Sequence, residues 1–441
     1  MHIIIVGNGI AGITAARHIR KQSDHRITVI SKETDFFFSR TALMYVYMGH
    51  LKFEHTQPYE NWFWQKNRIE LVRGTVETID FEQKTLHLSA DSTTVVYQPT
   101  WLERLTKAAP KQTAKAANLH TLTYDKLILA TGSVSRTRDW PGTELSGVQG
   151  LYSYQDLELL ETNSPRLKRA VIAGGGLIGV ELAEMLHTRG REVTMLVREK
   201  SYWAGTLPPE ESALVTQQIQ KHGIDLRFET ELKEIVGTDQ VEAVITDKNE
   251  KIDCQLVGLT IGVTPNISFL KNQKLALDKG ILVNEFLETN LPDVYAVGDC
   301  AEHRQPPAGR KTIEPIWYTG RIMGETVAQS ICGKRTAYCP GVFFNSAKFF
   351  DLEYQTYGDV PARLPEGMQT FYWQHPAKEM ALRINYRTET KAVTGFNALG
   401  IRLKHIVCEA WIQQKRTFDY VIKHLPEANF DPEFFEVPSI R

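Results

Sequence analysis

Residues 3–12 read Ile-Ile-Ile-Val-Gly-Asn-Gly-Ile-Ala-Gly, a short apolar run that leads into three glycines with the spacing Gly-x-Gly-x-x-Gly. The run predicts a buried strand, and the pattern after the glycines predicts a helix and then a second strand at 27–30. In such a unit Gly7 permits the tight turn, Gly9 lets the backbone approach a pyrophosphate, and Gly12 allows close helix–strand packing. The helix N-terminus offers its amides to the anion. The segment therefore predicts a dinucleotide-binding unit.

The chain repeats this pattern about one domain length later. An apolar strand at 170–173 leads into residues 174–179, which read Gly-Gly-Gly-Leu-Ile-Gly and open another helix. The positions of the three glycines are taken by Gly174, Gly176 and Gly179. One such motif also occurs as a tight turn in unrelated α/β units. Two of them predict two nucleotide-binding domains in one polypeptide.

An acidic residue about 20 residues beyond the glycines usually binds a ribose in units of this kind. In the first unit that acid is displaced, because Ser31 ends the second strand and Glu33 follows two residues later. Glu33 is our candidate for the ribose.

Two further apolar strands end in short motifs, one in Ala130-Thr131-Gly132 and the other in Gly298-Asp299. Together with the two glycine units, and in this order, they resemble the motifs of FAD-dependent pyridine nucleotide oxidoreductases with two dinucleotide-binding domains. The resemblance covers essentially all 441 residues. The chain looks most similar to the branch that holds ferredoxin and rubredoxin reductases, the flavin module of nitrite reductase and apoptosis-inducing-factor-like proteins.

The resemblance implies an α/β fold of the glutathione-reductase type. It has two Rossmann-like domains, the nicotinamide domain being inserted in the FAD domain, and an α+β C-terminal domain. We expect the FAD-binding domain at 1–149 and 267–338, the NAD(P)-binding domain at 150–266 and the C-terminal domain at 339–441. In the last of these, alternating aromatic runs predict strands, and an apolar stripe through Ile406, Ala410 and Trp411, continuing to Leu425, predicts an amphipathic helix.

The resemblance also assigns roles to single residues. FAD would lie on the first unit, with Asp299 hydrogen-bonding the ribityl chain and the Ala130-Thr131-Gly132 turn passing near the cofactor. The nicotinamide dinucleotide would lie on the second unit, with Glu181 near the nicotinamide amide. Two alternatives stay open: Asp299 as a helix N-cap, and Glu181 as an exposed helix carboxylate.

The segment after the second strand decides what the flavin can reduce. Disulfide-reducing members of the family carry cysteine there, next to the flavin, but residues 36–45 read Phe-Phe-Phe-Ser-Arg-Thr-Ala-Leu-Met-Tyr. Electrons must therefore leave directly from the flavin. Arg40 is our candidate for a fixed positive charge beside FAD. The branch often has a lysine where Tyr45 stands.

Trp317 precedes a predicted helix whose N-terminal dipole would face the flavin pyrimidine. It is either a flavin-lining residue or a core anchor without cofactor contact.

The donor is either NADH or NADPH. Arg198 stands where NADPH-using relatives hold the 2′-phosphate, and this favours NADPH as the donor. The charge of Glu199 acts in the opposite direction. The alternative is that Arg198 is a solvated charge at a strand end.

Composition excludes other classes of protein. There are 51 basic and 52 acidic residues, a formal charge of −1, so no overall field attracts nucleic acid or an anionic membrane. No window reaches the length of a membrane span, and we predict no metal site. The five cysteines form no Cys-x-x-Cys pair, and their odd number favours a reducing compartment, so we expect a cytoplasmic protein. We expect it to be a monomer or a homodimer. The basic stretch 89–123 predicts a solvated hairpin or short helix, or a docking surface for an acidic partner.

The sequence thus predicts an electron-transfer flavoprotein that takes hydride from NAD(P)H onto FAD. The electrons would pass to a ferredoxin- or rubredoxin-like protein, a quinone, oxygen or another small acceptor. The competing hypothesis is an apoptosis-inducing-factor-like flavoprotein with a redox-gated binding or assembly role.

Overall fold

The computed structural model describes residues 1–97, 120–271 and 273–433, and these form two compact units. The first unit takes the described residues within Met1–Val134, Tyr152–Leu157 and Val263–Pro340. The second takes those within Ser135–Leu151, Glu158–Gly262 and from Gly341 onward. Each unit is therefore built from segments that are distant in the sequence.

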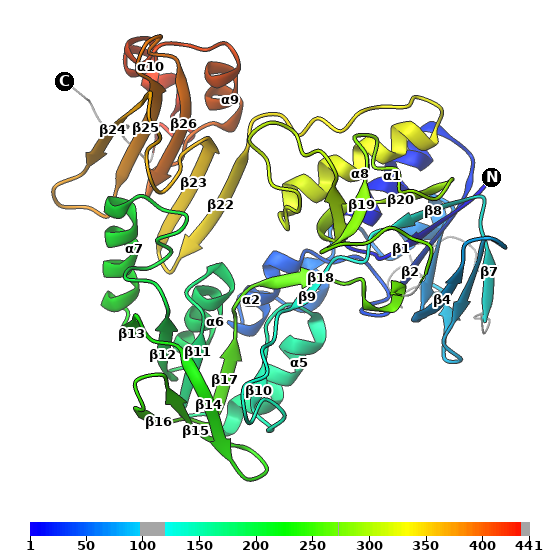
Figure 1. The fold of residues 1–441 in the computed structure, drawn as a ribbon, viewed down its shortest axis with the longest axis horizontal. Helices are drawn as coiled ribbons and strands as arrows, with labels where there is room; N and C mark the ends of the chain where they lie inside the picture. The colour runs from blue at the N-terminus through cyan, green and yellow to red at the C-terminus, as the bar shows by residue number, and fades with distance from the viewer. Residues whose placement is uncertain (98–119, 272, 434–441) are drawn as a thin grey trace, which may run out of the picture. The chain divides into compact units, whose positions relative to one another are not determined.

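The first unit contains a mostly parallel sheet (Figure 1). Its strands are β1 (His2–Val6), β2 (Arg26–Ser31), β3 (Ile69–Arg73), β6 (Thr93–Thr94), β8 (Lys126–Leu129) and β20 (Val294–Ala296). Their order is β20-β8-β1-β2-β3-β6, with only β6 antiparallel to its neighbour. Residues Ile3 to Ile5 are fully buried, as expected for a parallel strand covered on both faces. Strand β20 brings a late segment of the chain beside the first strands.

Helices cover this sheet, and two of them lie side by side: α1 (Ile10–Gln22) and α8 (Trp317–Ile331). They pack closely because α8 carries Gly324, where a Cβ would lie 2.4 Å from the carbonyl oxygen of Ala11. The other elements of this unit are α2 (Leu43–Tyr47), α3 (Trp62–Lys66), a sheet of β4 (Val76–Asp80), β5 (Thr85–Leu88) and β7 (Thr121–Thr123), and a pair of β19 (Ile281–Val283) and β21 (Ala301–His303).

The second unit contains a fully parallel sheet. Its strands are β10 (Val148–Gln149), β11 (Arg169–Ala173), β12 (Glu192–Val197), β13 (Asp225–Phe228) and β17 (Leu256–Leu259). Their order is β10-β17-β11-β12-β13. The order β17-β11-β12-β13 repeats that of β8-β1-β2-β3, but the edge strand β10 precedes the others in the chain, whereas β20 follows them. The helices are α6 (Leu177–Thr188) and α7 (Pro209–Lys221), and the antiparallel strands are β14 (Leu232–Gly237), β15 (Val241–Thr246) and β16 (Lys251–Asp253).

The second unit also holds a C-terminal antiparallel sheet, one face of which packs on helices α9 (His405–Gln413) and α10 (Phe418–His424) (Figure 1). Its strands, in the order β22-β23-β26-β25-β24, are β22 (Phe344–Phe349), β23 (Leu352–Gly358), β24 (Met368–Gln374), β25 (Ala381–Arg387) and β26 (Val393–Leu399).

A buried ion pair joins the C-terminal sheet to α7. The guanidinium of Arg383 on β25 donates to both carboxylate oxygens of Glu211, over 2.6 and 2.9 Å, and to Glu210 over 2.7 Å. The side chains of Arg383 and Glu211 are 5% and 0% exposed. Removing one partner of such a pair leaves a buried charge and costs about 3–5 kcal/mol.

The unit boundaries differ from the predicted crossing at 149/150. Strand β10 pairs with β17, so residues 135–151 belong with the second sheet. Residues 152–157 then return to the first unit. The remaining elements near the crossings are β9 (Ser133–Ser135), α5 (Tyr154–Asn163) and β18 (Val263–Pro265).

The C-terminal apolar stripe predicts a single helix that buries Ile406, and the structure differs on both points. Helices α9 and α10 replace the single helix, and they bury Cys408, Trp411 and Val421. The side chain of Ile406 is 76% exposed, so the apolar face of α9 does not include it.

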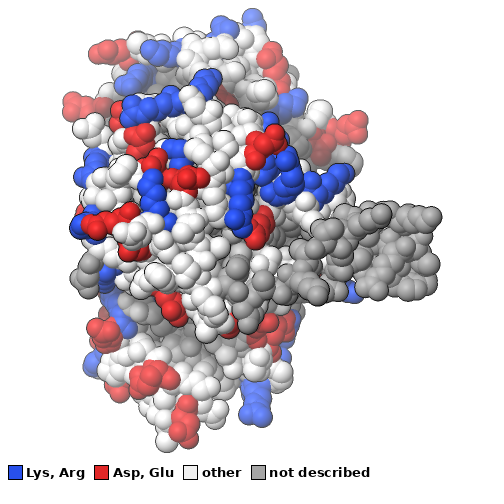
Figure 2. Space-filling view, turned by 90° about the vertical axis from the view of Figure 1, so that its right-hand side faces the viewer, with Lys and Arg blue, Asp and Glu red and all other residues white. Residues whose placement is uncertain are grey.

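Basic and acidic side chains are intermixed on the face seen in Figure 2, with uncharged surface between them. Most residues of the predicted basic stretch 89–123, including Arg104, Lys107, Lys111 and Lys115, lie outside the described residues. Among the residues that are described, no helix combines the length and the apolar character needed to cross a membrane.

Candidate functional site

The glycine turn after β1 has two tightly enclosed glycines and one open glycine. Gly7 has a φ of +118°, and a Cβ there would lie 2.1 Å from the carbonyl oxygen of Ala130. At Gly12 a Cβ would lie 2.1 Å from the carbonyl oxygen of Gly7. At Gly9, by contrast, no atom lies within 4 Å of the Cβ position. The outer glycines are thus needed by the fold, and the middle one leaves an open cradle.

The glycine turn after β11 has the same construction. Gly174 has a φ of +125°, and a Cβ there would lie 2.5 Å from the carbonyl oxygen of Thr260. At Gly179 a Cβ would lie 2.4 Å from the carbonyl oxygen of Gly174, whereas Gly176 has no neighbour within 4 Å. The second turn therefore offers the same cradle.

Each open glycine also precedes a helix whose first amides lack a side-chain cap. Gly9 is the N-cap of α1 and Gly176 is the N-cap of α6, and neither helix has an acidic residue in its first turn. Exposed amides and the positive end of the helix dipole form a binding site for phosphate oxygens. Both turns therefore fit the pyrophosphate of a dinucleotide.

The other small residues predicted around FAD gather at the same edge of the first sheet. The amide of Ala130 donates to Val6, at the end of β1. The hydroxyl of Thr131 donates to the carbonyl oxygen of Asn266 over 2.9 Å, and the amide of Asn266 donates to Gly132. Gly298 has a φ of +75°, and a Cβ there would lie 2.9 Å from that of Ala11 on α1.

Glu33 and Arg40 form one partly buried ion pair. The guanidinium donates to both carboxylate oxygens, over 2.8 and 2.6 Å, and the amide of Tyr154 donates to the same carboxylate over 2.9 Å. Burial alone would raise the pKa of Glu33, but the hydrogen bonds and charge of Arg40 lower it on balance. The candidate ribose ligand and the candidate flavin cation are thus charged partners.

Asp299 lies in a short 3-10 turn, Gly298–Cys300, after β20. Burial raises the pKa of its carboxyl group, while hydrogen bonds and the charge of Arg40 act in the opposite direction. One carboxylate oxygen accepts a hydrogen bond from the hydroxyl of Tyr152, over 3.2 Å. Sequence reasoning missed Tyr152, because no motif marks it and 147 positions separate it from Asp299.

Trp317 is the first residue of α8 and is partly buried, with its ring edge-on to Tyr318. Just before it, the carboxylate of Glu314 forms a buried ion pair with Arg310. The carbonyl oxygen of Glu314 accepts from the hydroxyl of Thr319, which fixes the loop at the start of the helix. This geometry is compatible with either predicted role of Trp317.

In the second unit, Glu181 lies on α6, one turn after the open glycine. Burial raises the pKa of Glu181 to about 7, and the charge of Glu184 adds to that shift. Glu184 accepts a hydrogen bond from the ammonium group of Lys348, on β22, over 3.2 Å. Near neutral pH the carboxyl group of Glu181 therefore exists in both protonation states, able to donate or accept a hydrogen bond.

Glu181→Gln is expected to stabilise the protein above pH 7. Since the folded-state pKa of Glu181 is raised above 4.5, the folded protein holds a proton that the unfolded chain releases, and stability falls as the pH rises from about 4.5 to about 7. The variant lacks this loss, so its free energy of unfolding should exceed that of the wild type by up to about 3 kcal/mol at pH 8. At pH 4 the gain should be absent.

Urea unfolding of the apoprotein at both pH values measures this difference. Glu234→Gln, at an exposed position on β14, is the matched control. An equal effect of Glu181→Gln at both pH values would contradict the assigned protonation.

Arg198 follows the last residue of β12, and its side chain is 62% exposed. Its guanidinium donates to the carboxylate of Glu199 over 3.0 Å. The two residues thus form a surface ion pair at the end of the strand, where a 2′-phosphate would compete with Glu199 for the same cation.

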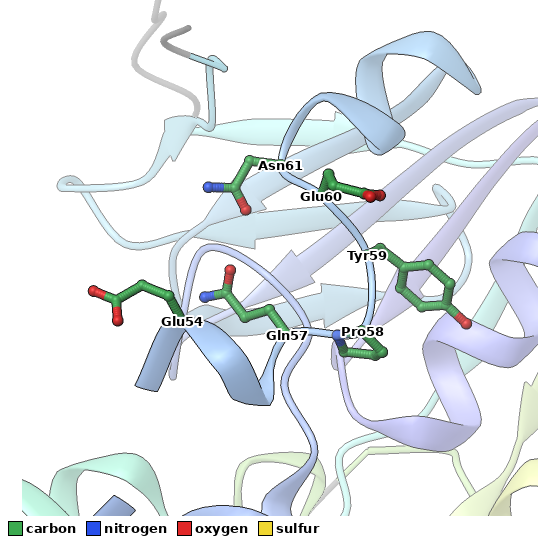
Figure 3. A pocket seen from close by; sticks show the side chains of 6 residues that line it. All are labelled: Glu54, Gln57, Pro58, Tyr59, Glu60 and Asn61. Atoms are coloured by element: carbon green, nitrogen blue, oxygen red, sulfur yellow. The ribbon is translucent and has the colours of Figure 1, made fainter. Parts of the chain in front are cut away.

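A surface hollow near α3 is separate from these residues. It is lined by Glu54, Gln57, Pro58, Tyr59, Glu60 and Asn61, as Figure 3 shows. The ring of Tyr59 packs on Phe63 and under the guanidinium of Arg17. None of the predicted site residues lines this hollow.

Comparisons with known proteins show similarity to oxidoreductases that use pyridine nucleotides. A model of the family described as pyridine nucleotide-disulphide oxidoreductase matches residues 1–329. The chain is 30% identical to an NADH oxidase of Methanocaldococcus jannaschii over 364 residues, which are 80% of this chain and 75% of that protein. It is 28% identical to a rubredoxin-NAD(+) reductase of Pseudomonas putida, covering 80% of this chain and 86% of that protein.

Another relative is much longer. The chain is 28% identical to a nitrite reductase (NAD(P)H) of Bacillus subtilis over 81% of its own length, but it spans only 41% of that protein. Among solved structures, a ferredoxin reductase from Rhodopseudomonas palustris superposes with a TM-score of 0.78 at 22% identity, over 96% of this chain and 99% of that one. This likeness confirms the predicted fold class.

Proposed function

This chain belongs to the pyridine nucleotide-disulphide oxidoreductase family, and from that premise we propose that it takes hydride from NADH or NADPH onto FAD and passes the electrons to an external acceptor. Membership confirms the predicted family and the predicted enzyme class, an FAD-dependent NAD(P)H oxidoreductase.

The observation that carries the proposal is the pair of open cradles. Gly9 and Gly176 each have free space at the N-terminus of a helix. They follow β1 and β11, which hold the same place in the corresponding orders β8-β1-β2-β3 and β17-β11-β12-β13. We assign FAD to the first cradle, since Asp299, Arg40 and the Ala130-Thr131-Gly132 turn belong to the same unit. We assign NAD(P)H to the second, with Glu181 as the residue that meets the nicotinamide amide. FAD, when bound, supplies an acceptor for hydride that can release electrons again.

In the proposed route, electrons pass from the flavin to the acceptor without a cysteine thiol. Residues 36–45, where disulfide-reducing members carry cysteine, contain none. All five cysteines are free thiols, and burial raises the pKa of Cys254, Cys300 and Cys408. Buried thiols with a raised pKa are poor nucleophiles. We propose that the acceptor is a rubredoxin- or ferredoxin-like protein, or oxygen, since the chain is similar to a rubredoxin reductase, a ferredoxin reductase and an NADH oxidase. The reducing cytoplasm is the proposed compartment.

Changing all five cysteines to serine is expected to leave NAD(P)H-dependent reduction of ferricyanide within about threefold of the wild-type rate. Serine cannot act as a redox group, so only packing losses at the buried positions should matter. Steady-state assays with FAD-saturated protein measure the rates, and near-UV circular dichroism identifies well-folded protein. A selective collapse of activity in folded protein would reveal a redox thiol. Negligible turnover of the wild type would favour the binding or assembly role instead.

Arg198→Ala is expected to raise the Michaelis constant for NADPH by roughly ten- to a hundredfold and to leave that for NADH nearly unchanged. A guanidinium forms charge-assisted hydrogen bonds with a 2′-phosphate, worth about 1.5–3 kcal/mol, whereas NADH has only a hydroxyl there. Glu199→Ala is the matched variant, which frees Arg198 from its surface ion pair and should favour NADPH. Unaltered NADPH kinetics of Arg198→Ala would end the NADPH assignment.

A further inference from the structure

Tyr152 contacts two of the residues that we assign to FAD, Asp299 and Arg40. Its hydroxyl donates to the carboxylate of Asp299 over 3.2 Å and accepts from the amide of Ser133 over 3.2 Å. Its ring lies against the guanidinium of Arg40, with 4.6 Å between the ring centre and Cζ. Its carbonyl oxygen accepts from Nη1 of Arg40 over 2.6 Å. One side chain thus links the two charged groups of the site.

The hydrogen-bond pattern fixes where the phenol proton goes. Burial raises the pKa of Tyr152, and the charge of Asp299 raises it further, so the phenol stays neutral. A neutral phenol has a single proton to donate. Because the amide of Ser133 donates its own proton to the phenol oxygen, the phenol proton is left for Asp299.

Tyr152 also separates two opposite charges. The guanidinium of Arg40 gives both of its terminal nitrogens to Glu33, and the described residues include no ion pair between Arg40 and Asp299. Yet the charge of Arg40 acts on the pKa of Asp299. The hydrogen bond from Tyr152 therefore restrains the orientation of the Asp299 carboxylate beside this cation.

We propose that Tyr152 is a cofactor-positioning residue, which orients the carboxylate of Asp299 through its hydroxyl and holds Arg40 through its ring and carbonyl oxygen. The inference rests on the proposed FAD site of the first unit. Tyr152 acts on the affinity for FAD through Asp299.

Tyr152→Phe isolates the hydroxyl, because the ring and the carbonyl oxygen remain beside Arg40. The dissociation constant of FAD, from quenching of flavin fluorescence during titration of the apoprotein, should rise about tenfold, as expected for the loss of one hydrogen bond to a charged group. The thermal midpoint of the apoprotein should stay close to that of the wild type. Tyr124→Phe, which removes another buried hydroxyl of the same unit, is the matched control and should change the constant less than about twofold.

A double-mutant cycle tests whether Tyr152 acts through Asp299. In an Asp299→Ala background, Tyr152→Phe should change the dissociation constant by less than about twofold. Equal effects in both backgrounds, or an unchanged constant for Tyr152→Phe alone, would overturn the inference. A wild-type apoprotein that binds no FAD would instead refute the proposed function itself.

Discussion

Gly176→Arg is expected to abolish reduction of the bound flavin by NADH and NADPH while leaving FAD in place. At this position φ is −95° and no atom lies within 4 Å of the Cβ position, so the backbone accepts a side chain. The arginine would fill the space that the pyrophosphate needs at the start of α6. Losing two charge-assisted hydrogen bonds of about 2 kcal/mol each weakens binding about a thousandfold.

Anaerobic mixing of the variant with each donor measures this effect through the flavin absorbance. Gly176→Ala is the control, since a methyl group meets no atom there and should retain most of the wild-type rate. Dithionite should still bleach the flavin of Gly176→Arg. If that variant were reduced by NAD(P)H at the wild-type rate, the donor site would have to lie elsewhere.

Gly9→Arg is the reciprocal change and should give protein without flavin. Gly9 also has open space around its Cβ position and an ordinary φ of −70°, so the apoprotein should fold. The side chain would occupy the first cradle and prevent the pyrophosphate from reaching the amides of α1. Asp299→Ala should weaken FAD binding by a separate route, the loss of a buried hydrogen-bond acceptor.

The flavin content of purified Gly9→Arg, from the ratio of flavin to protein absorbance, measures the outcome. The matched control is Gly9→Ala, which should retain FAD. Stoichiometric FAD in both Gly9→Arg and Asp299→Ala would refute the assignment of FAD to the first unit.

Local backbone requirements explain why the sequence predicted the two parallel sheets. Gly7 and Gly174 adopt positive φ values, and Gly12 and Gly179 lie against backbone carbonyl groups, so these positions tolerate glycine only. These requirements therefore appear in the sequence as glycines at a fixed spacing. The apolar runs of β1 and β11 then define the strands.

Contacts between distant segments left no such signal. Tyr152 and Asp299 are 147 positions apart, and Lys348 and Glu184 are 164 apart. Each of these contacts joins polar residue types that are common at protein surfaces, so neither partner stands out in the sequence. Strand β10 is two residues long and has no periodicity, which is why the predicted crossing near Gly150 differs from the unit boundaries.

Anaerobic titration of the purified holoprotein tests the central claim most directly. Because a hydride carries two electrons, an equimolar amount of NADH or NADPH should bleach the flavin absorbance completely, with no thiol consumed. A flavin that neither donor bleaches, although dithionite does, would contradict the proposal that this chain passes hydride from a nicotinamide to FAD.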